Sequence, residues 1–120
     1  MRQDVVLALH DEQLTEHGGA SGLRDAGLLD SALARPQNLL AYGEPDAAAL
    51  AAAYAFGIAR NHPFADGNKR TAAVTMLVFL GINGVEYETG EAELVVMTLA
   101  LAAGDLSEDE VAAWLRNRLT

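Results

Sequence analysis

The sequence predicts one compact all-α domain over residues 1–120, built from about six helices around a buried central helix. A chain of 120 residues with 51% hydrophobic content is large enough to bury a single core. Apolar residues recur at helical spacing through most of the chain, and glycine or proline separates the segments. The longest apolar run, AAVTMLVFLGI, has 11 residues, which indicates a core helix and not a membrane span.

The first predicted helix covers residues 4–17 and ends at the glycine pair of residues 18 and 19. Its apolar face is expected to hold Val6, Leu9 and Leu14. The two histidines of this segment, His10 and His17, are interpreted as surface or helix-end residues. The glycine-rich stretch GGASGLR that follows is predicted to be a loop.

A second helix is predicted to start after Asp25, whose carboxylate can cap it, and to run through AGLLDSALA. Pro36 is expected to break or restart this helix, because proline cannot donate a hydrogen bond to the preceding turn. The stretch LLAYGEPD, residues 39–46, then indicates a turn or a short extended flap.

Asp46 is the expected cap of a third helix that extends to about Arg60, with an apolar stripe formed by Leu50, Tyr54 and Ile58. Pro63 disfavours helix at the residue before it, so NHPFADG is predicted to be a loop, with Phe64 as a core anchor. A fourth helix should begin at residue 67 or 68 and reach residue 83. It is apolar on nearly all sides, so it is the expected buried central helix.

The C-terminal part of the chain predicts a turn with a short extended piece at NGVEYET, followed by two helices. The fifth helix, EAELVVMTLALAA, is expected to end at Gly104. The sixth begins at Ser107 with Glu110 three residues later, which is a capping-box pattern. Its inner stripe is predicted to be Val111, Leu115 and Leu119.

Composition narrows the function classes. A net charge of −9 and a pI near 4.5 argue against nonspecific binding of DNA or RNA, which needs a basic face. The absence of cysteine excludes disulfides and thiolate metal sites. The N-terminus MRQDVVLALHDE makes a poor signal peptide, so we expect a cytoplasmic protein without a membrane segment.

Chemically active side chains concentrate in ARNHPFADGNKRTAAV, residues 59–74, which holds the only lysine and two of the seven arginines. The stretch ends at a predicted helix N-terminus, where free amide groups and the helix dipole favour an anion. Lys69 and Arg70 lie in the first turn of that helix, where the same dipole disfavours cations unless an anion compensates them. Gly67 lets the backbone approach a ligand closely. These features predict a phosphate-binding site.

Two further side chains of this loop suggest transfer chemistry on a phosphate. His62 can accept a proton from a hydroxyl near neutral pH, and Asp66 is the oxygen ligand that Mg²⁺ prefers. Asn68 can donate a hydrogen bond to a phosphate oxygen. Simpler interpretations stay open: a loop histidine without chemistry, an ordinary Asp-Gly turn, and an asparagine that only caps the helix. A P-loop is excluded, because the upstream glycine and strand are missing.

The string HPFADGNKRTA closely resembles the signature of the Fic/Doc superfamily, H-x-F-x-[D/E]-G-N-G-R-x-x-R, and specifically that of Doc toxins from bacterial toxin–antitoxin modules. LALHDEQLTEHGG, GLRDAGLLDSAL and FLGINGVEYE also resemble Doc segments, so the likeness covers most of the chain. It implies an all-α fold and ATP with Mg²⁺ as substrate. Lys69 and Ala73 depart from the general pattern, and Doc proteins share the lysine.

The resemblance implies that the γ-phosphoryl group of ATP is transferred to a threonine of translation elongation factor Tu. By the same resemblance His62 is the general base, Asp66 is the magnesium ligand, and the phosphate-binding set is Gly67, Asn68, Lys69 and Arg70, with Arg60 as a further member. Two alternatives remain: transfer of AMP to a target hydroxyl, since Asp66-Gly67-Asn68 follows the general Fic pattern, and a catalytically silent antitoxin-binding corepressor.

Control by a separate protein is also implied. Many Fic enzymes carry an inhibitory [S/T]-x-x-x-E-[G/N] string, and the nearest match here, TGEAEL with Thr89 and Glu93, is broken by Leu94. The resemblance therefore implies a cognate antitoxin whose tail lies in a groove beside the active site, with apolar side chains as anchors.

Overall fold

The computed structural model describes residues 1–88 and 90–119 and confirms the all-α class. Its six helices are α1 (Gln3–His17), α2 (Ala26–Tyr42), α3 (Ala47–Asn61), α4 (Asn68–Ile82), α5 (Glu91–Ala103) and α6 (Glu108–Arg116). The only strand-like pairing among these residues is two isolated antiparallel bridges, Leu23 with Phe64 and Tyr87 with Leu119. None of the helices in this part of the chain has the length and hydropathy to cross a bilayer.

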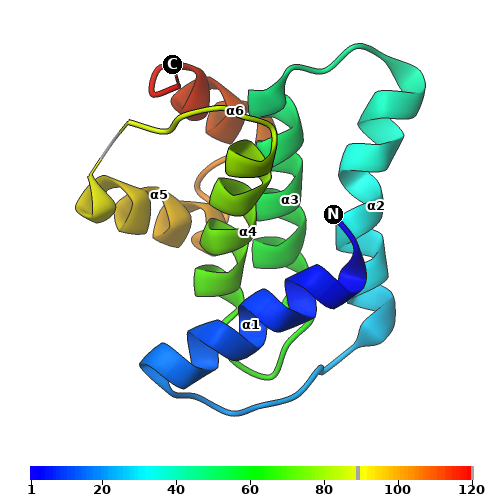
Figure 1. Ribbon diagram of the computed structural model, residues 1–120, viewed down its shortest axis with the longest axis vertical. Coiled ribbons are helices and arrows are strands. Elements are labelled where there is room, and N and C mark those ends of the chain that lie inside the picture. The colour runs from blue at the N-terminus through cyan, green and yellow to red at the C-terminus, as the bar shows by residue number, and fades with distance from the viewer. Residues whose placement is uncertain (89, 120) are drawn as a thin grey trace.

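Helix α3 is the central element of the bundle. It packs against α2, α4, α5 and α6, and in Figure 1 it stands in the middle with α1 crossing the lower end of the bundle. Most of its buried residues are alanines, whose small side chains let neighbouring helices approach closely from several sides. The prediction that the helix at 67–83 is the buried central one was wrong. Helix α4 does contribute Thr75, Met76 and Leu80 to the core, but several of its apolar side chains stay partly exposed.

Helix α2 runs unbroken through Pro36, so the predicted break at this residue was wrong. Proline at this position leaves the carbonyl of Ala32 without its intrahelical donor. Helix α3 lies against that point: a Cβ placed on Gly57 would be 3.0 Å from the Ala32 carbonyl oxygen. This close packing against α3, together with the complete burial of Pro36, holds the helix together. The predicted flap at 39–46 is consequently helical as far as Tyr42, and only residues 43–46 form a connection.

Helix α1 presents a different face to the bundle from the one that hydropathy indicates. Its buried residues are Val6, His10 and Gln13, whereas Leu9 and Leu14 are half-buried. The interpretation of His10 as a surface residue was wrong, because only 2% of it is exposed. His17 is exposed at the end of the helix, as expected.

The predicted caps are confirmed. The carboxylates of Asp25 and Asp46 accept hydrogen bonds from Leu28 N and Ala49 N at 3.0 and 2.8 Å. Ser107 and Glu110 form the complete capping box.

The extended piece after α4 pairs with the C-terminal end of the chain through the Tyr87–Leu119 bridge. Thr89, the start of the broken inhibitory string, lies outside the described residues.

Candidate functional site

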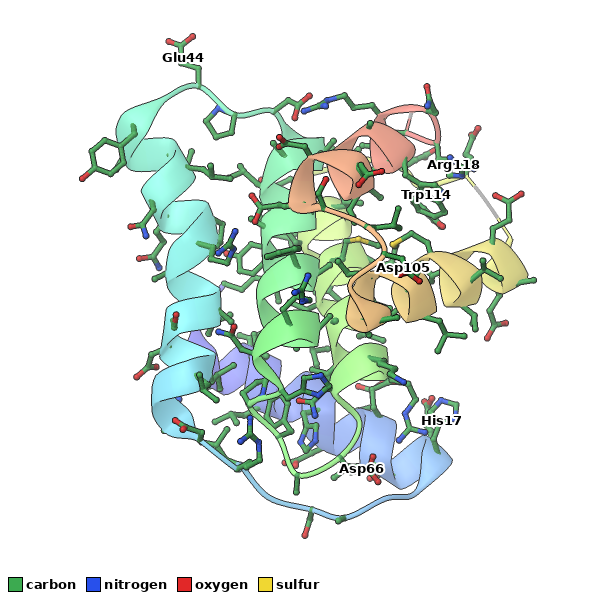
Figure 2. All side chains as sticks on the ribbon, turned by 180° about the vertical axis from the view of Figure 1, so that it is seen from behind. His17, Glu44, Asp66, Asp105, Trp114 and Arg118 are labelled. Carbon is green, nitrogen blue, oxygen red and sulfur yellow. The ribbon has the colours of Figure 1, made fainter. Side chains whose placement is uncertain are left out.

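The loop between α3 and α4 forms one wall of a surface cavity of about 630 Å³ at the end of the bundle. Figure 2 shows Asp66 at this end, on the same side as His17, and far from Glu44 at the opposite end. The cavity is lined by His17, Gly18, Gly19, His62, Ala65, Asp66, Gly67, Asn68, Lys69 and Arg70. The structure thus brings together every predicted site residue except Arg60. The guanidinium of Arg60 lies 5.3 Å from the ring centre of Phe56, and the residue does not line the cavity.

His62 ends α3 in a left-handed conformation, with φ 50° and ψ 56°. Among the described residues it is the only non-glycine residue with positive φ. That conformation costs an L-residue roughly 1–2 kcal/mol, so the surrounding contacts must maintain it. Its side chain is exposed, and within the described part of the chain the imidazole has no hydrogen-bond partner. The ring is therefore free to act on a ligand in the cavity.

Asp66 points its carboxylate at the glycine-rich loop after α1. Its Oδ1 accepts a hydrogen bond from Gly67 N at 2.8 Å, and its Oδ2 lies 3.4 Å from Ala20 N. A Cβ on Gly19 would come within 2.7 Å of Oδ2, so glycine at 19 leaves the space in which this carboxylate lies. A carboxylate offers about four lone-pair sites, so capacity remains for a hard cation.

The donor set fits a magnesium ion that is shared with a substrate. No group of three or more acidic or histidine side chains that could enclose a metal exists among the described residues. Mg²⁺ is commonly held by one or two carboxylates and completes its octahedral shell with water and phosphate oxygens. Asp66, exposed in a cavity beside two cations, matches that requirement.

Asn68 is the first residue of α4, and its amide is committed to the loop. Its Oδ1 accepts from Phe64 N at 2.9 Å, and its Nδ2 donates to Phe64 O at 3.0 Å. The residue is 9% exposed. It does not cap the helix, since Gly67 at the cap position has no side chain and Asn68 bonds backwards to the loop. Its chief observed contact is therefore with the protein backbone.

The cationic wall of the cavity comes from the first turn of α4. Lys69 is exposed, and Arg70 donates to the carbonyl of Gly18 at 3.0 Å. In the described part of the chain neither residue forms an ion pair with a carboxylate. Two cations without anionic partners at a helix N-terminus make a site for a negatively charged ligand. Gly67, with φ 76°, gives the turn that brings the helix start to the cavity.

His10 supports this loop from below, which the sequence did not indicate. Its ring is stacked on Phe64 with centroids 3.7 Å apart and planes 8° apart. Its Nε2 lies 2.8 Å from the carbonyl oxygen of Asp66, and since a carbonyl can only accept, Nε2 is the donor. A signal was present in the spacing, because His10 follows the buried Val6 by four residues and therefore shares its helix face.

Known proteins similar in sequence to this chain cover the stretch that forms the cavity. The Fic/DOC family model matches residues 1–80, which include the whole loop and most of α4. The chain is 38% identical over 114 residues to "Protein kinase doc" of Escherichia phage P1, covering 94% of this chain and 90% of the relative. It is 43% identical over 121 residues to "Toxin Doc" of Mycolicibacterium smegmatis, covering 95% and 88%. The chain belongs to the Fic/Doc family.

Proposed function

We propose that this protein is a Doc-type toxin of a bacterial toxin–antitoxin module, a transferase that phosphorylates a protein hydroxyl with ATP. The observation that carries the proposal is the pair of cations, Lys69 and Arg70, which face the same cavity as a free imidazole and a carboxylate. Relatives at 38% and 43% identity are named a protein kinase and a toxin, which supports the same assignment. A threonine of translation elongation factor Tu, in the cytoplasm, is the proposed acceptor.

In the proposed reaction His62 accepts the proton of the acceptor hydroxyl. The hydroxyl oxygen forms a bond to the γ-phosphorus of ATP as the bond between that phosphorus and the β–γ bridging oxygen breaks, and ADP leaves. Lys69, Arg70 and the amide groups at the start of α4 hold the phosphates and balance their charge. Phosphoryl transfer depends mainly on such positioning and charge stabilisation.

Asp66 is the proposed ligand of Mg²⁺, which would bind together with ATP. The ion neutralises charge on the phosphate oxygens when it is bound. Asp66 contributes one carboxylate, kept at the cavity by its bond to Gly67 N. Asn68 is a smaller part of this proposal than the sequence suggested, since its amide is engaged with Phe64. Arg60 lies outside the cavity, so the phosphate role expected for it is left out.

The residues at positions 69 and 73, Lys69 and Ala73, are the reason to propose phosphoryl transfer over AMP transfer. The general Fic pattern has glycine and arginine at these places, which leave room for a triphosphate along the helix and clamp it. Lys69 occupies that room with a charge, and Ala73 lines a neighbouring apolar groove, where it offers no clamp. We therefore propose that the nucleotide lies with its γ-phosphate, and not its α-phosphate, opposite His62.

Isotope and mass measurements on the unmutated protein test this proposal. The protein is incubated with purified elongation factor Tu and ATP labelled at either the α or the γ position. Transfer of γ label with a mass gain of about 80 Da supports phosphorylation, whereas α label with about 329 Da establishes AMP transfer, as the transferred groups require. No modification of this or any other protein in a translation extract would leave only the silent corepressor.

An apolar groove beside the cavity is the proposed seat of the antitoxin. It lies between α1, α4 and α5, has a volume of about 320 Å³, and includes Val95 and Leu99, each 50% exposed. His17, Lys69 and Arg70 line both the groove and the phosphate cavity. A bound segment would therefore meet the cations that hold ATP. This continuity provides a physical route from antitoxin binding to inhibition.

Introduction of negative charge into the groove tests the antitoxin site. Val95→Glu combined with Leu99→Glu should weaken binding of the cognate antitoxin at least tenfold, because a docked apolar side chain would meet buried charges. The matched control is Val96→Glu, on the same helix, 67% exposed, and outside this groove. Equal binding by the double variant and the control, measured by calorimetry, would place the antitoxin elsewhere.

A further inference from the structure

Three consecutive carbonyl groups at the end of α3 are held by one short stretch before α2. Arg24 donates from Nε to His62 O at 2.7 Å and from Nη2 to Asn61 O at 3.0 Å. The backbone N–H groups of Arg24 and Asp25 both donate to Pro63 O, at 2.7 and 3.0 Å. In return Asn61 Nδ2 donates to Leu28 O at 2.9 Å. The end of α3 and the start of α2 thus each donate hydrogen bonds to the other.

These contacts satisfy groups that a helix end leaves free. The last carbonyls of an α-helix have no intrahelical donor, and the negative end of the helix dipole lies there. A guanidinium group supplies two parallel donors and a positive charge in one rigid plane. Arg24 uses both features at the point where the chain turns into the left-handed conformation of His62.

The direction of the His62 ring depends on this backbone. Within the described residues its imidazole makes no hydrogen bond, so no such bond orients it. A left-handed residue is strained, and Pro63 disfavours a helical His62, so without Arg24 the end of α3 can fray at His62. Fraying moves the Cα–Cβ bond of His62, and with it the ring.

We propose that Arg24 is a positioning residue that holds the backbone of His62, and so aims the catalytic imidazole, without touching the nucleotide. The inference rests on the proposed function of His62 as the general base. Arg24 does not line the phosphate cavity, and its Nε and Nη2 are engaged by carbonyl groups. It is thereby distinct from Lys69 and Arg70, the cations that face the ligand.

Three roles for Arg24 give different kinetic results. A positioning residue changes kcat and leaves the KM for ATP nearly unchanged, because the ground-state phosphate contacts persist. A phosphate ligand would raise the KM for ATP. A residue important only for stability would lower the melting temperature and the active fraction, without changing kcat per folded molecule.

The variants are Arg24→Met, which keeps the side-chain stem and removes every donor, and Arg24→Lys, which keeps the charge with a single donor nitrogen. Arg2→Met is the matched control, because Arg2 is exposed and its side chain bonds only to Asp4 among the described residues. With elongation factor Tu as acceptor, Arg24→Met should lose about 10- to 100-fold in kcat, the scale of a misplaced catalytic group. The KM for ATP should stay within about twofold, and Arg24→Lys should recover part of the loss.

A spectroscopic readout separates this inference from the proposed function. The carbonyl ¹³C shifts of Asn61 and His62 and the ¹³Cα shift of His62 should change in Arg24→Met and stay as in the wild type in Arg2→Met. If the wild-type protein modifies no acceptor, the proposed function fails while these shifts still test the backbone contact. Unchanged shifts, an unchanged kcat, or a loss expressed only in the KM for ATP would each overturn the role given to Arg24. If Arg24→Met does not fold, the same measurements are made on Arg24→Lys: a lower kcat with changed ¹³C shifts supports the positioning role, and wild-type values of both overturn it.

Discussion

The side-chain amide of Asn68 exchanges two hydrogen bonds with the backbone of Phe64, at 2.9 and 3.0 Å. The pairing imitates a β-bridge, with a side chain in place of a second strand. Phe64 also forms a true bridge with Leu23 on its other side and stacks on His10. The buried ring of Phe64 thus fixes the middle of the loop whose two ends carry His62 and Asp66.

Asn68→Ala should therefore destabilise the protein more than a surface asparagine change. It leaves the buried N–H and C=O of Phe64 without partners, which costs about 1–3 kcal/mol for each group, or roughly 2–6 kcal/mol in the free energy of unfolding. Asn83→Ala is the control, since Asn83 bonds to Phe79 O at 2.8 Å on the exposed side of a helix end. That change should cost less than about 1 kcal/mol.

Urea unfolding of both variants provides the measurement. The sequence alone suggested that Asn68 contacts phosphate. An Asn68→Ala protein with wild-type stability and a raised KM for ATP would restore that interpretation and contradict the structural role.

Much of the fold could be predicted because helix ends carry local signals. Asp25, Asp46 and the Ser107–Glu110 box all cap the helices predicted for them. The failures concern tertiary packing, which local patterns do not contain. Pro36 stays in a helix where α2 packs closely against α3 and buries the proline, and a small residue at 57 has no local reason to be there.

The site was predictable in its residue types but not in its contacts. One contiguous stretch, the loop with the first turn of α4, supplies His62, Asp66 and the cations, so a single motif located them. Their supports come from α1 and from the stretch before α2, many residues away. His10 looked like a surface histidine, and Arg24 like an ordinary loop residue, because a single sequence does not reveal which distant carbonyl a side chain reaches.

Two helical glycines give a paired test of the α2–α3 contact. Gly57→Ala should destabilise the protein by about 1–3 kcal/mol, because the new Cβ would lie 2.9 Å from the Cα of Ala32, and backbone there cannot move easily. Gly81→Ala meets nothing within 4 Å and should stabilise it by up to about 1 kcal/mol through helix propensity. Thermal unfolding compares them, and a Gly57→Ala protein as stable as Gly81→Ala would show that the helices separate at no cost.

The Asp46–Arg116 pair predicts a small pH dependence of stability. The hydrogen bond from Arg116, with a contribution from Ala49 N–H, holds the pKa of Asp46 below its ordinary value. A depressed carboxyl pKa stabilises the fold above the unfolded-state pKa, and this contribution disappears as the pH falls through the folded-state value. Asp46→Asn keeps a competent cap and removes the charge. It should lower stability by less than about 1 kcal/mol at pH 7, since the pair is exposed, and the difference should begin to shrink only below about pH 4 and vanish below the lowered pKa of Asp46.

Melting temperatures of the two proteins between pH 3 and pH 7 check this dependence. Arg116→Gln should show the same convergence, because it removes the other partner. A gap between wild type and Asp46→Asn that is constant with pH would assign the effect to the cap instead of the ion pair.

His62→Asn is the sharpest test of the catalytic assignment. Asparagine tolerates the left-handed conformation better than most residues, so the helix end and the contacts from Arg24 should persist. Loss of a general base should then reduce kcat about 10²–10⁴-fold with little change in melting temperature.

His17→Asn is the matched control, because His17 is also exposed and lines the same cavity but ends α1, away from the loop. Its loss should be no more than about tenfold, since a wall residue affects substrate binding more than proton transfer. A folded His62→Asn protein that retains wild-type kcat would mean that the proton of the acceptor hydroxyl goes to another group.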